Sequence, residues 1–474
     1  MTVNGDLAFT SASDLRDLIG ARQVSPVELV KLYYERIDRL DPQLNAYLTL
    51  TTDEALKTAQ AAEDAIMRGD DLGPLHGVPI GVKDLEMTAG IRTTGGSLVY
   101  KDRMPTADSI VVERVRAAGA VILGKTNTPE LGLLGHTENR LGDHCRNPWD
   151  TTRTTGGSSG GAGSALAAGL CPLATGGDGG GSIRIPASFC GVYGIKPTQG
   201  RVPKYGGRPG TMMANQFSQQ GPLSRTVKDS AILLQVLAGH DRRDAGSLRE
   251  SPDDYVGALE QDVKGLRIGW SRDLGYAPVE TEVAEMSAAA ARAFEDLGCT
   301  VEEADISLES PFDTFWVVFT ANLYTGYGEL LRTRAVDLTW YTRRCLENGA
   351  RVTGGEYSAA LGGIEELKAR FVDAFDRYDL LLTPTMSGTA YPVGEPPAQI
   401  DGIDAYREIG VPAFTYPINM IGHPAASIPC GLASDGLPVG LQIIGPRGGE
   451  GTMIAASAAF ERARPWGERR PPVS

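Results

Sequence analysis

The pattern of apolar and polar positions predicts helices and strands that alternate along much of the chain. The segment Ser25-Pro26-Val27-Glu28 combines an S-x-x-E capping box with a proline at the first helical position. Asp41-Pro42 is expected to end this helix, and residues 109–119 carry a second amphipathic helix pattern. Between the two ends of the first helix, apolar side chains recur at helical spacing: Leu29, Leu32, Tyr33, Ile37 and Leu40.

Short apolar runs predict strands that are buried on both faces. A predicted helix from about Val279 to Leu297 separates strands at 265–271 and 299–305, which makes a βαβ unit. This order predicts an α/β fold with a large mixed, mostly parallel central sheet covered by helices on both faces. Since no repeat or long linker interrupts it, we expect one domain over 1–474, with a variable region at about 250–375 packed on the core. Further strands are expected at 77–84, 120–127, 379–385 and 438–446.

Composition and charge narrow the range of partners. The 42% hydrophobic and 22% charged residues are ordinary for a soluble globular protein. The net charge of −14 repels phosphate backbones, which predicts no nucleic-acid binding. No apolar run reaches the roughly 18 residues needed to cross a bilayer. The start, MTVNGDLAFT, lacks a basic, apolar leader, so we expect a cytoplasmic protein without a membrane segment.

Two motifs suggest chemistry that their surroundings exclude. Residues 119–126, GAVILGKT, fit the P-loop pattern, but their four variable positions need burial and a helix pattern precedes them. The segment around Ser158 fits the G-x-S-x-G elbow of α/β-hydrolases, which requires an apolar strand directly before the serine. NPWDTTRTT is polar instead, and only His240 and His423 follow. We therefore expect neither a nucleotide site nor a Ser-His-Asp triad.

Metal chemistry has little support in the sequence. His136 and His144 could be ligands, but neither H-E-x-x-H nor C-x-x-C accompanies them, so a structural role is favoured. The six cysteines are dispersed, as expected of reduced, buried thiols. We predict no metal and no cofactor.

A glycine-rich loop at 174–197 offers a different chemistry. Three consecutive glycines run into Ser182, and Pro186 follows in a predicted short helix. Glycines let the backbone approach a ligand closely, so that several N–H groups can point at one oxygen. The expected donors of such an oxyanion hole are the N–H groups of Gly179, Gly180, Gly181 and Ser182.

Three segments carry a family resemblance. GVPIGVKD, TTGGSSGGAGSALAAG and GGDGGGSIRIPASFCGVYGIKPT resemble the signature of the amidase signature family of serine hydrolases, and the likeness extends over nearly the whole chain. The resemblance implies that Lys83 is the catalytic lysine, that Ser158 follows a cis peptide bond, and that Ser182 is the nucleophile.

The resemblance also implies a mechanism without a cofactor. Ser182 attacks an amide, ester or carbamate carbonyl, and Ser158 passes its proton to a neutral Lys83. Water then releases the acid from the acyl-enzyme. Four further residues are expected to support this site: Gly157 at the cis bond, Asp178 and Arg184 in the nucleophile loop, and Ser159, which positions Lys83 or Ser158 or has only a local role.

The substrate is less defined. We expect a stand-alone hydrolase of aryl or hydrophobic small-molecule amides; the alternative is the amidase subunit of a tRNA-dependent amidotransferase. Such subunits commonly read SIRQP, whereas residues 182–186 read SIRIP. Pocket candidates are 212–217, 315–327 and the surroundings of Met386, and a homodimer remains open. The aromatic residues expected either to line an apolar pocket or to pack a helix core are Phe315, Trp316, Phe319, Tyr324 and Tyr327.

Overall fold

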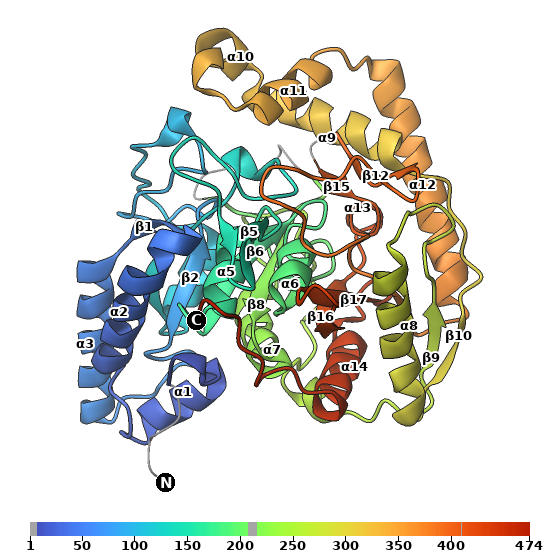
Figure 1. The fold of residues 1–474 in the computed structure, drawn as a ribbon. Helices are drawn as coiled ribbons and strands as arrows, with labels where there is room; N and C mark the ends of the chain where they lie inside the picture. The colour runs from blue at the N-terminus through green and yellow to red at the C-terminus, as the bar shows by residue number, and fades with distance from the viewer. Residues whose placement is uncertain (1–6, 207–215, 409) are drawn as a thin grey trace.

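A mixed sheet of 11 strands forms the centre of the computed structural model, which describes residues 7–206, 216–408 and 410–474 (Figure 1). The strands are β1 (Tyr47–Leu50), β2 (Pro79–Lys83), β3 (Val121–Thr126), β6 (Leu173–Asp178), β7 (Tyr193–Lys196), β8 (Gln219–Ser224), β9 (Arg267–Trp270), β10 (Thr300–Glu303), β11 (Leu380–Pro384), β16 (Ala425–Leu432) and β17 (Pro438–Ile444). They lie in the order β1-β3-β2-β6-β8-β7-β16-β17-β11-β9-β10.

The directions of the strands differ in part from the prediction. Parallel pairing is confined to two blocks, β3-β2-β6 and β11-β9-β10. The other neighbours, including the β16–β17 hairpin, pair antiparallel. The predicted mixed α/β sheet is therefore confirmed, but most of its pairs are antiparallel. Apolar runs identify buried strands without giving their direction, which explains the difference.

Helices cover both faces of this sheet, as predicted. Leu173 in β6 packs in one core cluster with residues of α7 and α14, while the adjacent Ala174 packs with residues of α5 and α6. Successive strand residues point to opposite faces, so these two helix pairs lie on opposite sides. The helices are α1 (Ala12–Gly20), α2 (Pro26–Leu44), α3 (Thr52–Arg68), α4 (Ile110–Ala117), α5 (Gly160–Ala167), α6 (Arg184–Cys190), α7 (Val227–Leu237), α8 (Thr281–Asp296), α9 (Phe312–Tyr327), α10 (Glu329–Thr333), α11 (Trp340–Gly349), α12 (Gly354–Phe375), α13 (Tyr416–Ile421) and α14 (Glu450–Ala463).

The first long helix begins as predicted but ends later. Ser25 Oγ accepts hydrogen bonds from the N–H groups of Val27 and Glu28. The helix passes through Pro42 and ends at Leu44, so the expected end at Asp41-Pro42 is wrong. The side chain of Leu44 is fully buried, and its packing outweighs the hydrogen bond that proline cannot donate.

Residues 250–375 divide between the sheet and a helical layer. The predicted βαβ unit is confirmed as β9, α8 and β10, whose two strands pair in parallel. Helices α9 to α12 follow and lie together along one edge of the molecule (Figure 1). Short strand pairs complete the chain: β4 (Arg146–Asn147) with β5 (Asp150–Thr154), β12 (Gln399–Ile400) with β13 (Ile403–Asp404), and β14 (Tyr406–Arg407) with β15 (Val411–Pro412).

The P-loop-like segment is a buried strand. Residues 121–126 form β3, and all six are buried between β1 and β2. The side chain of Lys125 is also buried, where its Nζ donates to the Thr88 hydroxyl at 2.6 Å. The burial of this segment agrees with the prediction that it does not form a nucleotide site. Over the described residues, none of the helices combines the length and apolar content needed to cross a bilayer.

Candidate active site

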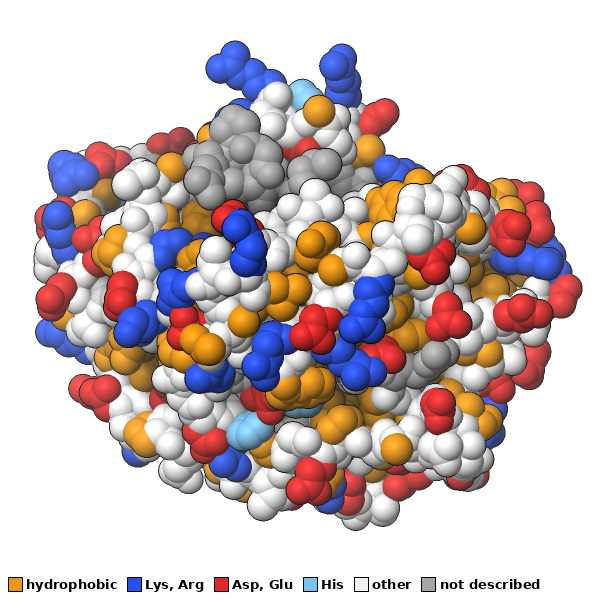
Figure 2. Space-filling view, turned by 90° about the horizontal axis from the view of Figure 1, so that it is seen from above, with side chains coloured by type: hydrophobic (Ala, Val, Ile, Leu, Met, Phe, Trp, Pro, Cys, Tyr) orange, Lys and Arg blue, Asp and Glu red, His pale blue; other side chains and the backbone are white. Residues whose placement is uncertain are grey.

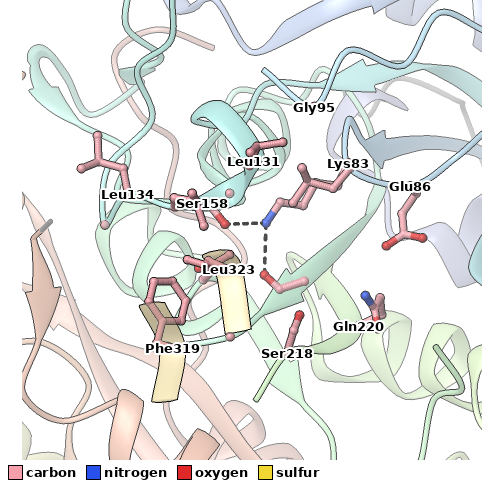
Figure 3. Close-up of a pocket in the computed structure, with 18 of the residues that line it drawn as sticks. Lys83, Glu86, Gly95, Leu131, Leu134, Ser158, Ser218, Gln220, Phe319 and Leu323 are labelled. Atoms are coloured by element: carbon pink, nitrogen blue, oxygen red, sulfur yellow. Dashed lines mark hydrogen bonds between the residues drawn. The ribbon is translucent and has the colours of Figure 1, made fainter. Parts of the chain in front are cut away.

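Lys83 ends strand β2 and points into a cavity with its amine buried. Its Nζ lies 2.8 Å from Ser158 Oγ, 2.8 Å from Ser159 Oγ and 3.1 Å from the Gly177 carbonyl oxygen (Figure 3). Burial lowers the pKa of Lys83 to about 7, against the opposing attraction of the Asp178 and Glu86 carboxylates. The side chain can therefore exchange a proton near neutral pH.

The first glycine-rich loop holds Ser158 next to this amine. The Gly157–Ser158 peptide bond is cis, and α5 begins two residues later. A Cβ added at Gly157 would lie 2.7 Å from the backbone of His136, so only glycine fits there. The N–H of Ser159 donates to the Ser182 carbonyl at 3.1 Å, which ties this loop to the second one.

The second loop is organised around a buried ion pair. Arg184 donates to both carboxylate oxygens of Asp178 at 2.9 Å, and both side chains are fully buried. Asp178 also accepts from the N–H groups of Gly181 and Ile183, at 2.8 and 3.2 Å. Burial alone would raise the pKa of Asp178, but the Arg184 charge outweighs it and holds the pKa well below its usual range. The carboxylate thus stays ionised and fixes the turn.

The expected oxyanion donors fall into two groups. The N–H of Gly181 is occupied by Asp178. Within the described part of the chain, the N–H groups of Gly179, Gly180 and Ser182 form no hydrogen bond, and all three residues line the cavity. Gly181 has a φ of +128°, and a Cβ there would collide with the Thr415 hydroxyl, so the turn requires glycine.

One cavity of about 180 Å³ joins these parts. Lys83, Ser158 and Ser182 line it together, and Ser182 is the partly exposed one of the three. Much of the remaining wall is apolar: Leu131, Leu133, Leu134, Phe315, Phe319, Leu323 and Tyr327. The arrangement can hold an apolar molecule beside a serine hydroxyl, backbone donors and a buried amine.

The predicted pocket segments contribute unequally. From 315–327, Phe315, Phe319 and Tyr327 line the cavity, whereas Trp316 packs against Phe312 in the neighbouring core and Tyr324 is 41% exposed. Met386 lies in a separate core cluster. Of residues 212–217, the first four lie outside the described residues.

Other residues at the site carry no motif that sequence reasoning could use. Asn419 and Gln442 hold Arg184 from α13 and β17, each with an oxygen 2.6 Å from a guanidinium nitrogen. Glu86, Ser109 and Gln220 line the cavity beside Lys83. Glu86 stands three residues after Lys83, and this proximity was the one signal that could have found it.

The two candidate metal ligands lie apart from this cavity. The His136 side chain is buried. The imidazoles of His136 and His144 lie 3.4 and 3.5 Å from the same carboxylate oxygen of Glu138. In residues 7–206, 216–408 and 410–474, no group of three or more His, Cys, Asp or Glu side chains is arranged to hold a metal ion.

Known proteins resemble the chain over nearly its full length. Residues 28–454 match the family model Amidase. The acylamidase of Rhodococcus erythropolis is 35% identical over 472 residues, 98% of either chain. A glutamyl-tRNA(Gln) amidotransferase subunit of Moorella thermoacetica is 40% identical over 490 residues, 98% of this chain and 99% of that one. The crystal structure of a bacterial aryl acylamidase of the amidase signature enzymes superimposes with a TM-score of 0.90 at 36% identity, covering 97% of both chains.

Proposed function

Since the chain belongs to the amidase family, we propose that it hydrolyses carboxylic amides through an acyl-enzyme formed on Ser182. One observation carries the proposal. The buried Lys83 amine lies 2.8 Å from Ser158 Oγ, in a cavity that Ser182 also lines. The amine and the two hydroxyls have the chemistry of a proton relay.

In the first step, Ser182 Oγ attacks the substrate carbonyl carbon as its proton passes through Ser158 to Lys83. Lys83 must be neutral at this stage, and a pKa of about 7 makes it so above neutral pH. The N–H groups of Gly179, Gly180 and Ser182, which have no hydrogen-bond partner among the described residues, are the proposed donors to the tetrahedral oxyanion. Removing one such donor typically costs about 3 kcal/mol of transition-state stabilisation.

In the second step, the proton returns through Ser158 to the leaving amine, and the C–N bond breaks. Water then attacks the acyl-enzyme with the same relay as base, which releases the acid and restores Ser182. Esters and carbamates fit the same sequence of steps, because their carbonyl carbon is attacked in the same way. The supporting residues hold the relay in place: Gly157, Ser159, Asp178 and Arg184.

The apolar wall of the cavity supports aryl or hydrophobic small molecules as substrates. Phe315 and Phe319 stack with ring centroids 5.1 Å apart, and leucines 131, 133 and 134 line the cavity with them. The R. erythropolis relative is an acylamidase and the superimposed crystal structure is an aryl acylamidase, in keeping with this choice. The identity of 40% to an amidotransferase subunit favours a second candidate, the amidase subunit of a tRNA-dependent amidotransferase.

Replacing the nucleophile tests the proposal. We expect Ser182→Ala to abolish hydrolysis of acyl anilides, and Lys83→Ala to reduce it nearly as far. The matched control is Ser251→Ala, since Ser251 is exposed and should leave the rate unchanged. A fluorophosphonate probe should attach to Ser182 in the wild type, as read by peptide mass spectrometry. Wild-type rates in Ser182→Ala, or attachment at another serine, would refute the assignment.

A further inference from the structure

The cavity has a second, polar end that the reaction above does not use. Glu86, Ser109 and Gln220, which we call the polar end, line it with exposed fractions of 6%, 3% and 5%. In Figure 3, Glu86 and Gln220 lie on the opposite side of the Lys83 amine from Leu134 and Phe319. The cavity is therefore apolar on one side of the reacting groups and polar on the other.

Two side chains at the polar end carry oxygen atoms that can accept hydrogen bonds. Gln220 Oε1 is buried and has no partner among residues 7–206, 216–408 and 410–474. Ser109 Oγ donates to Glu86 Oε2 at 2.7 Å, and a carboxylate has lone pairs for several further donors. A buried acceptor without a donor is costly, and structures rarely retain one without a use.

The groups around the polar end leave its acceptors available. Burial raises the pKa of Glu86, and this effect exceeds the opposing ones of the Ser109 and Gln220 hydrogen bonds and of the nearby Lys125 and Lys83 amines. Lys125 is itself held elsewhere, by the Glu86 backbone carbonyl and the Thr88 hydroxyl. Arg103 also lines the cavity, but its Nε donates to the Thr93 carbonyl at 2.7 Å. The acceptors that the polar end offers to a ligand are thus the side-chain oxygens of Glu86 and Gln220.

We propose that the polar end binds a nitrogen-borne hydrogen-bond donor of the substrate, an ammonium or an amide N–H group. The inference rests on the proposed amide hydrolysis and specifies its substrate class. The substrate has an apolar group at one end and an N–H donor at the other, with the scissile carbonyl held between them at Ser182. Glu86 and Gln220 are then specificity residues of this site.

Matched substrates test the inference. Three series of p-nitroanilides carry acyl chains of two to five methylenes that end in a methyl, an amino or a carboxamide group. We expect the wild type to prefer the amino or carboxamide chains over the methyl chains by at least about tenfold in kcat/KM at the best length. If variants of the polar end lose only the preference for amino chains, the ligand is an ammonium. If they lose the preference for carboxamide chains, the ligand is a neutral N–H group.

Two variants change the acceptors separately. Glu86→Gln removes the ionisable carboxyl but keeps an oxygen acceptor, and Gln220→Met removes the amide at constant length. Glu86→Gln should reduce the preference for amino chains to about threefold or less, and Gln220→Met should do so for the chains that the wild type prefers, both mainly through KM, with circular dichroism checking the fold. Gln220→Met decides alone if Glu86→Gln does not fold. The control Glu366→Gln alters an exposed residue of α12 and should keep the preference.

The two proposals fail differently. Equal rates for all three series in the wild type, or an unchanged preference in folded variants, would overturn the role of the polar end while leaving amide hydrolysis standing. If the wild type hydrolyses no anilide and the serine probe does not attach to Ser182, both proposals are wrong.

Discussion

At position 83, burial turns a side chain that is normally charged into one that can accept a proton. With a pKa of about 7, Lys83 is protonated in acid and neutral in mild base. The proposed relay needs the neutral form, so kcat/KM should rise with pH through about 7 and level off above it. A pH–rate profile on an uncharged anilide measures this directly.

One shape of the pH–rate profile would contradict the proposed role of Lys83. A rate that falls as pH rises through 7 would mean that the protonated amine is the active form. Because Glu86 attracts the Lys83 proton, Glu86→Gln should move the rising limb to lower pH. Glu366→Gln, which changes an exposed carboxylate of α12, should leave the limb where it is.

Asp178 accepts the hydrogen bonds that organise the second glycine-rich loop. Asp178→Asn removes the charge that compensates the buried Arg184 and weakens the acceptor for the Gly181 and Ile183 N–H groups. Breaking a buried pair by removing one partner typically costs about 3–5 kcal/mol. We expect a loss of that size in the free energy of unfolding, measured by urea denaturation at pH 7.

An exposed ion pair supplies the comparison. Arg332 and Glu329 pair at 3.1 Å on α10 with side chains 79% and 74% exposed, so Arg332→Gln should change the stability by less than about 1 kcal/mol. A folded-state carboxyl with a depressed pKa stabilises above its unfolded pKa, and this contribution disappears as the pH falls. The difference between wild type and Asp178→Asn should therefore shrink in acid. A constant difference at all pH values would contradict the role of the charge.

At the scale of helices and strands, the cavity wall follows a simple period. Phe315, Phe319, Leu323 and Tyr327 are spaced four residues apart on α9, and all four line the cavity. Residues at this spacing share one helix face. Within 315–327, this spacing distinguishes the four cavity residues from Trp316 and Tyr324. The aromatic composition of the segment alone does not distinguish them.

That face should select aryl substrates. Phe319→Leu removes a ring that stacks on Phe315, and such contacts contribute about 0.5–1.5 kcal/mol beyond buried area. We expect the kcat/KM ratio of an anilide to an N-methylamide of the same acid to fall by up to about tenfold. Tyr324→Leu on the exposed side of α9 is the control and should keep the ratio. An unchanged ratio in Phe319→Leu would mean that α9 does not contact the aryl group.

The strands and the site residues also show how much of the fold can be predicted from the sequence. Apolar runs located β2, β3, β9, β11 and β17 to within a few residues, because every residue of β2, β3, β11 and β17 and the two central residues of β9 are buried. Strand direction was not predictable from them, since it depends on how the connections cross the sheet. At the site, the glycine loops and Lys83 were recognisable from local motifs, whereas Asn419, Gln442 and Gln220 reach it from distant segments. Such contacts exist only once the chain is folded.

For the whole molecule, charge separates the two candidate functions. The chain carries 59 acidic and 45 basic residues, and Figure 2 shows both kinds interspersed on the face seen from above. A protein that neutralises many phosphates needs a basic surface, and its affinity for nucleic acid falls steeply with salt. A net charge of −14 therefore favours a stand-alone hydrolase over a subunit that acts on charged tRNA.

We expect the purified chain to hydrolyse anilides without partners, ATP or tRNA. In a gel-shift titration at about 150 mM salt, micromolar protein should leave tRNA unshifted, because the net negative charge repels the phosphate backbone. The assay needs a basic RNA-binding protein as positive control. Hydrolysis that appears only when tRNA and the other proteins of an amidotransferase complex are added would favour the complex instead. Partner-free turnover that Ser182→Ala removes would assign the activity to this single chain.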